Sequence, residues 1–74
     1  GRKFGEPFGI AVKGNAIFVS DGERGRIVRI ENGVITPFAE GLDTPSGIAF
    51  APDGRLIVAD SGANTIVSID SSGA

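Results

Sequence analysis

The chain has 74 residues, a formal net charge of −2 at pH 7, and no Cys, Met, Trp, Tyr or His. A chain of this length forms at most one small domain, and without Cys no disulfide bond can stabilise its core. No apolar run approaches the ~20 residues of a transmembrane helix, so we expect no membrane partner.

The charge is distributed unevenly along the chain. Residues 1–30 carry six basic and three acidic side chains, a net charge of +3, whereas residues 31–74 carry one basic and six acidic side chains, a net charge of −5. Such halves attract each other weakly, and salt screens the attraction. The alternative is that these charges are solvated residues of turns and edges.

Short β-strands joined by turns are the predicted elements. The predicted strands cover residues 8–12, 16–20, 26–31, 34–38, 46–51, 55–59 and 65–70. Asn32-Gly33 predicts a type I′ hairpin turn between two of them, because that turn needs positive φ at both central positions. Pro52-Asp53-Gly54 predicts a second turn. No segment shows the 3.6-residue period of a helix with its caps.

Three segments of the first half recur in the second half. Residues 7–12 match residues 45–50 at an offset of 38, and the next two segments, 17–21 and 27–30, match 56–60 and 66–69 at an offset of 39. One extra residue in the turn at Pro52-Asp53-Gly54 accounts for the change. A period near forty residues with several short strands is typical of propeller blades.

These motifs resemble the NHL repeat over about residues 5 to 74. Both copies contain Pro-x-Gly-Ile-Ala, a turn, a strand that ends in Asp, a small polar loop and an Ile-Val-x-Ile strand. The resemblance implies an all-β fold of two four-stranded antiparallel blades from a six-bladed β-propeller. Repeat 1 would cover about residues 5–43, and repeat 2 about residues 44–74 with its outer strand missing. Propellers of this type include RNA-binding modules, scaffolds, lyases and gluconolactonase-like hydrolases, so the fold alone does not choose a function.

Asp21 and Asp60 follow the second strand of each repeat. One interpretation makes them metal ligands or general bases. The other makes them structural turn carboxylates that accept backbone N–H bonds in the following loop. A catalytic group is seldom needed once per repeat, so we expect the structural role and no catalytic residue.

Phe8 and Ser46 occupy the position between Pro and Gly at the start of each inner strand. In the gluconolactonase-like families this position faces the mouth of the central channel and often carries Asn, Asp or Glu ligands for a divalent cation. Hard cations prefer oxygen ligands, above all carboxylates. Phe and Ser therefore argue against a metal site, and we expect no cofactor. The lyases of this architecture depend on His, which the chain lacks.

Arg24, Arg26 and Arg29 are candidates for a basic patch that binds nucleic acid. Arg26 and Arg29 are three residues apart in a predicted strand, so they point to opposite faces. The chain also has no Tyr or Trp for base stacking, and its net charge is negative. We therefore expect no nucleic-acid partner.

The residues favour a non-enzymatic repeat unit that associates with itself, as a scaffold or binding module. The alternative is an inactive fragment of a gluconolactonase-like hydrolase. Two blades leave two apolar faces bare, so we expect a homo-oligomer, with a trimer favoured because three pairs make six blades. Gly1, Arg2, Lys3 and Phe4 are candidates to complete the second blade of a neighbouring copy.

Gly9 and Gly47, which follow Phe8 and Ser46, are predicted to allow close approach of the inner strands. A side chain would not fit at either position on this hypothesis. Gly47→Val should then lower thermal stability more than Ser46→Ala does.

Overall fold

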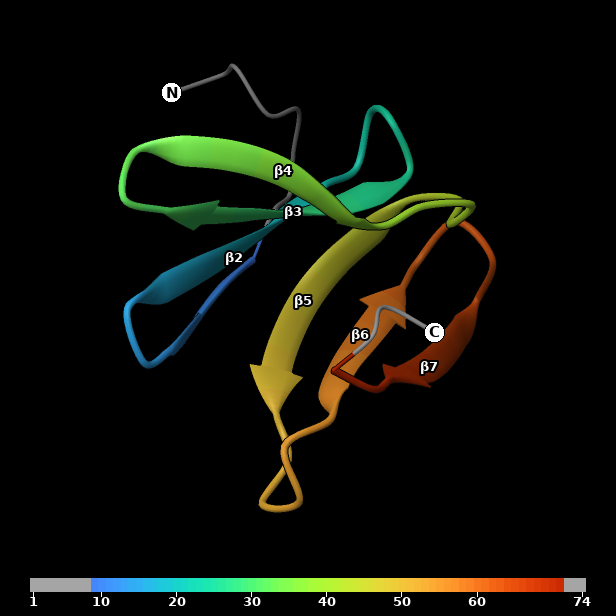
Figure 1. Cartoon of the computed structure of the whole chain (residues 1–74). Helices are drawn as coiled ribbons and strands as arrows, with labels where there is room; N and C mark the ends of the chain where they lie inside the picture. Colours follow the sequence, from blue (N-terminus) through green and yellow to red (C-terminus); the bar gives the residue numbers. More distant parts are fainter. Residues whose placement is uncertain (1–8, 72–74) are drawn as a thin grey trace.

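The computed structural model describes residues 9–71, which form seven β-strands in two antiparallel sheets (Figure 1). The strands are β1 (Ile10–Lys13), β2 (Ala16–Asp21), β3 (Arg26–Glu31), β4 (Val34–Ala39), β5 (Pro45–Phe50), β6 (Leu56–Asp60) and β7 (Thr65–Ile69). No helix long and apolar enough to cross a membrane occurs in this part of the chain. The all-β class is confirmed, and each predicted strand is present with limits shifted by at most two residues. Phe8 and residues 1–4 lie outside the described residues.

The first sheet has the order β1-β2-β3-β4, with each strand antiparallel to the next. β-Branched residues are frequent in β2 and β3, where they suit a pleated and buried surface. Asn32 and Gly33 have φ values of 55° and 77°, so the predicted turn between β3 and β4 is confirmed. Pro37 lies in the edge strand β4, where a missing N–H on the open side costs no ladder bond.

The second sheet has the order β5-β6-β7. Its strands are the repeat counterparts of β1, β2 and β3, and β4 has no counterpart among residues 9–71. The pairing of β5 with β6 shifts register between Pro45 and Ile48. Ser46 and Gly47 lie at this irregularity, next to Gly9 and Ser20 of the first half of the chain.

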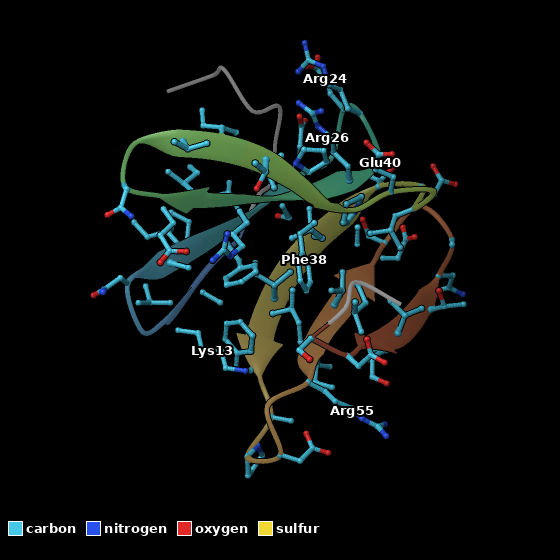
Figure 2. The ribbon with its side chains drawn as sticks, viewed as in Figure 1. Lys13, Arg24, Arg26, Phe38, Glu40 and Arg55 are labelled. Carbon is cyan, nitrogen blue, oxygen red and sulfur yellow. The ribbon has the colours of Figure 1, made fainter. Side chains whose placement is uncertain are left out.

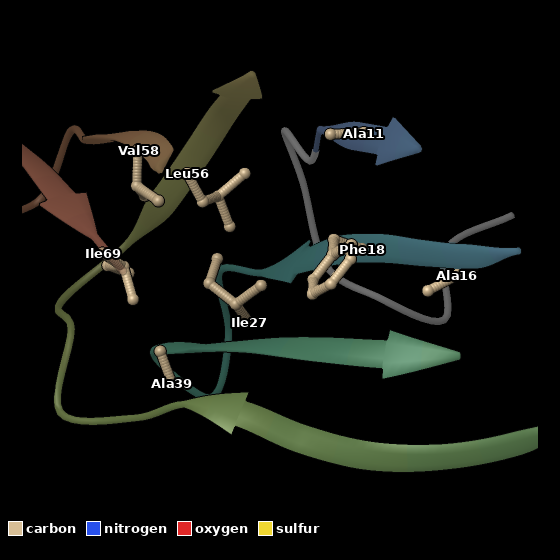
Figure 3. Packing of buried hydrophobic residues seen from close by; sticks show 8 residues of the cluster. All are labelled: Ala11, Ala16, Phe18, Ile27, Ala39, Leu56, Val58 and Ile69. Atoms are coloured by element: carbon tan, nitrogen blue, oxygen red, sulfur yellow. The ribbon is translucent and has the colours of Figure 1, made fainter. Parts of the chain in front are cut away.

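One apolar core lies between the two sheets (Figure 3). Its buried members from the first sheet are Ala11, Ala16, Phe18, Ile27 and Ala39, and those from the second sheet are Leu56, Val58 and Ile69. The Phe18 ring meets Phe38 of its own sheet and Phe50 of the other sheet edge to face, with centroids 4.9 and 5.1 Å apart. Phe18 therefore joins the two sheets through one aromatic cluster.

Candidate functional site

The backbones of the two sheets approach closely where Gly9 and β2 face the start of β5. A Cβ at Gly9 would lie 2.5 Å from the Ser46 carbonyl oxygen and 2.9 Å from the Ile48 nitrogen. The buried Ser20 hydroxyl donates to the same Ser46 oxygen at 2.7 Å and accepts from the Gly9 amide at 2.6 Å. Because backbone atoms cannot move aside cheaply, this contact requires glycine, and the prediction for Gly9 is confirmed.

Gly47 occupies the same position in the second repeat, but its surroundings differ. A Cβ at Gly47 would meet no heavy atom within 4 Å in the described part of the chain. The predicted close approach at Gly47 is therefore wrong for the contacts within this chain. The physical reason is that no strand among residues 9–71 covers this face of the second sheet. The expected ranking of Gly47→Val against Ser46→Ala does not follow from the packing of a single chain.

The outer face of the first sheet is apolar and partly open, since Val19 and Val28 on this face are buried. Ile10, Val12 and Ile17 project from it with exposed fractions of 56%, 63% and 40%. Their repeat counterparts all pack between the sheets; these are Ile48, Phe50 and Leu56. The outer face of the first sheet is therefore equivalent, in the repeat, to the face with which the second sheet packs on the first.

The outer face of the second sheet corresponds, residue by residue, to the inner face of the first sheet. It presents Ala49, Ile57, Ala59 and Ile66, of which Ile66 is 74% exposed. The counterparts of these residues in the first sheet are buried against the second sheet; they are Ala11, Phe18, Ser20 and Ile27. The two outer faces of the chain are thus the repeat equivalents of the two inner faces that pack against each other.

Asp60 fixes the connection between the sheets. Its buried carboxylate accepts the amides of Asp43 at 2.9 Å and Thr44 at 2.7 Å, both in the link from β4 to β5, and the Ala63 amide at 3.3 Å. The Asp43 amide does most to lower the pKa of Asp60, and the amides of Thr44, Ala63 and Gly62 act in the same direction against the opposing effect of burial. A carboxylate held ionised by backbone donors is suited to ordering a loop.

Asp21, at the matching position of the first repeat, contacts arginines. It accepts the Arg24 amide, Arg24 Nη1 and Arg26 Nε, each at 3.4 Å. Arg29 forms an ion pair with Glu31. Figure 2 shows Arg24 and Arg26 near one end of the first sheet, whereas Lys13 lies towards the other end. The basic side chains are therefore spread over the sheet, and three of them contact a carboxylate.

Ser46 lies beside Asp60 across the sheet, since the preceding Pro45 pairs with Asp60. The Ser46 hydroxyl donates to the Ala59 carbonyl at 3.2 Å. Asp21 belongs to the other sheet, so these predicted site residues do not form one cluster. Across residues 9–71, no group of three or more His, Cys, Asp or Glu side chains could hold a metal ion. Phe8, the other channel-mouth candidate, lies outside the described residues.

A groove of about 630 Å³ lies between the sheets, beside the β1–β2 turn, β4 and the end of β7. Its walls include an apolar set, Phe18, Phe38, Phe50, Leu56 and Ile69, and a charged set, Lys13, Arg29, Glu31 and Asp70. The Lys13 amine donates to the Gly54 carbonyl at 3.2 Å and lies 5.2 Å from the Phe50 ring centroid. Sequence reasoning missed this groove, because no local pattern shows that Lys13 and Phe50 meet.

Two comparisons with known proteins find similarity to NHL repeats. The family model of the NHL repeat matches residues 42–68. NHL-repeat-containing protein 4 of Mus musculus is 39% identical over 70 residues, which cover 89% of this chain and 51% of the relative. The chain thus spans about half the length of this curated relative. With the repeated strand order and the sheet-on-sheet packing described above, these matches support an NHL-repeat fragment, and its two antiparallel sheets are consistent with the blades of a β-propeller.

Proposed function

We propose that this chain is a non-enzymatic blade pair that associates with its own copies into a closed propeller, which serves as a scaffold or binding module. The observation that carries the proposal is the duplication of the internal interface on the two outer faces. Ile10, Val12 and Ile17 are exposed, whereas their counterparts pack in the core. Burial of these side chains by a second copy would remove apolar surface from water at each junction.

The contact between copies is of the head-to-tail kind, because two different faces of the chain meet. Such contacts either close into a ring or continue into fibres. The NHL resemblance favours six blades, and two blades per chain then require three copies. The basic first half and acidic second half of neighbouring copies would attract each other at low ionic strength.

The open edge of the second blade supports an exchange of strands between copies. Within residues 9–71, β7 pairs with β6 alone, so its other edge is free to add a strand. A strand that paired with β7 as β4 pairs with β3 would lie beside the groove that Ile69 lines. We assign this place to residues 1–4 of a neighbouring copy.

A non-enzymatic role is supported by the contacts of the two recurring carboxylates. Asp60 accepts backbone amides of the connection between blades, and Asp21 contacts Arg24 and Arg26. Each carboxylate thus has a structural partner set that explains its presence. No catalytic partners are needed to explain why the two carboxylates are present.

Light scattering coupled to size exclusion tests the proposal. We expect a molar mass of three times the 7.5 kDa of one chain. A folded monomer at micromolar concentration would refute self-association, and a dimer would refute the ring. Deletion of residues 1–4 should weaken the association, and unchanged association would remove the strand-exchange part alone.

A further inference from the structure

Among residues 9–71, no contact requires the residue at position 47 to be glycine. Its φ lies outside the left-handed region, and a Cβ there would meet no atom of residues 9–71 within 4 Å. Gly9, its repeat counterpart, also lies outside that region, and its missing Cβ leaves room for the backbone of β5. The difference between the two glycines is the presence of a neighbouring blade, not the conformation of the backbone.

We infer that Gly47 is the contact point of a second copy of this chain and sets how closely two copies pack. This inference rests on the proposed self-association and names the surface that carries it. The surface consists of Gly47, Ala49, Ile57, Ala59 and Ile66, on the outer face of the second blade. The occupant is the outer face of the first blade of another copy, with Ile10, Val12 and Ile17.

The internal interface supplies the geometry for this assignment. Against the first blade, the backbone at Ser46 and Ile48 comes within 3 Å of where a Gly9 Cβ would stand. When a second copy packs its first blade on the second blade in the same way, its backbone at Gly9 and Ile10, the counterparts of Gly47 and Ile48, meets Gly47. A methyl group at Gly47 would then collide with backbone atoms, which is costly because they cannot rotate away.

Two neighbouring positions show where the two interfaces differ. Ser20, which donates to the Ser46 carbonyl at 2.7 Å, is replaced in the second blade by Ala59. Gly25, whose missing Cβ makes room for the Leu42 carbonyl, is replaced by Asn64. The internal interface and the interface between copies are therefore equivalent in the strands that face each other. The contact between copies lacks one hydrogen bond that the internal contact has.

The test compares Gly47→Ala with Gly9→Ala by sedimentation over a range of chain concentrations, with circular dichroism to report folding. Gly47→Ala should weaken association roughly tenfold to a hundredfold, since overpacking of one methylene carries penalties of that order. The dissociated Gly47→Ala chain should remain as folded as the dissociated natural chain. Gly9→Ala carries the same methyl group at the internal contact, and it should destabilise the chain itself.

Ala59→Ser is a second test variant, which adds a contact between copies instead of removing one. It restores the hydroxyl that Ser20 supplies at the internal interface, so it should tighten association about twofold to tenfold, the usual net value of one hydrogen bond. Unchanged association in both Gly47→Ala and Ala59→Ser, with a natural chain that does associate, would overturn this inference and leave the proposed function standing. A natural chain that stays monomeric would overturn both.

Discussion

Removal of the Phe18 ring should destabilise the chain more than most single changes, because this ring joins the two blades. Phe18 is 5% exposed and contacts Phe38 and Phe50 edge to face at 4.9 and 5.1 Å. Substitution of a buried Phe by Ala costs ~3–5 kcal/mol of unfolding free energy. A 74-residue chain has a total of roughly 4–11 kcal/mol at ~0.05–0.15 kcal/mol per residue. Phe18→Ala should therefore remove a large share of the stability.

Urea denaturation followed by circular dichroism measures this effect at one fixed chain concentration, because association would otherwise contribute to the midpoint. Phe18→Leu should cost less, about 1–3 kcal/mol, since it keeps most of the apolar volume and loses the two ring contacts. Val34→Ala is the matched control on the edge strand β4, where Val34 is 59% exposed, and it should change the stability by less than about 0.5 kcal/mol. If Phe18→Ala cost no more than Val34→Ala, the packing between the blades would be wrong.

Two further predictions concern Asp60 and metal binding. The folded-state pKa of Asp60 lies below its ordinary value of 3.8, so its stabilising contribution is fully present above pH 3.8 and is lost as the pH falls through the lowered pKa. Asp60→Asn should be less stable than the natural chain at neutral pH, and the difference should shrink in acid; a difference independent of pH would contradict the role of the charge. Calorimetric titration with calcium and zinc should show no specific binding, because Phe8 offers no oxygen ligand and the Ser46 hydroxyl alone is a poor ligand for a hard cation. A stoichiometric site of micromolar affinity would contradict this expectation.

Local sequence was sufficient to predict the strands and the turns. The β3–β4 turn depends on two adjacent residues, Asn32 and Gly33, whose positive φ values are favoured by their own chemistry. The strands depend on short β-prone runs between such turns. The limits of β3 agree with the prediction at both ends, since Gly25 and Asn32 bound it.

The internal repeat made it possible to predict blades as well as single strands. The matched segments at offsets of 38 and 39 residues indicated two copies of one unit, and the three strands that both copies share form antiparallel sheets of the same order. The repeat also predicted that Asp21 and Asp60 stand in equivalent places. It did not predict that Asp60 receives amides of the connection between blades while Asp21 contacts arginines.

Only the tertiary structure decided how equivalent residues differ. Gly9 and Gly47 share the same local sequence, Gly-Ile-Ala, yet a Cβ at Gly9 would meet the backbone of the neighbouring blade and a Cβ at Gly47 would meet none of residues 9–71 within 4 Å. The groove that joins Lys13 to Phe50 and Gly54 is likewise formed by segments about forty residues apart. Local chemistry determines backbone conformation, because it acts through adjacent residues. Burial and close approach depend on which other segment covers a face, and a repeated sequence presents the same face whether or not a neighbour is there to cover it.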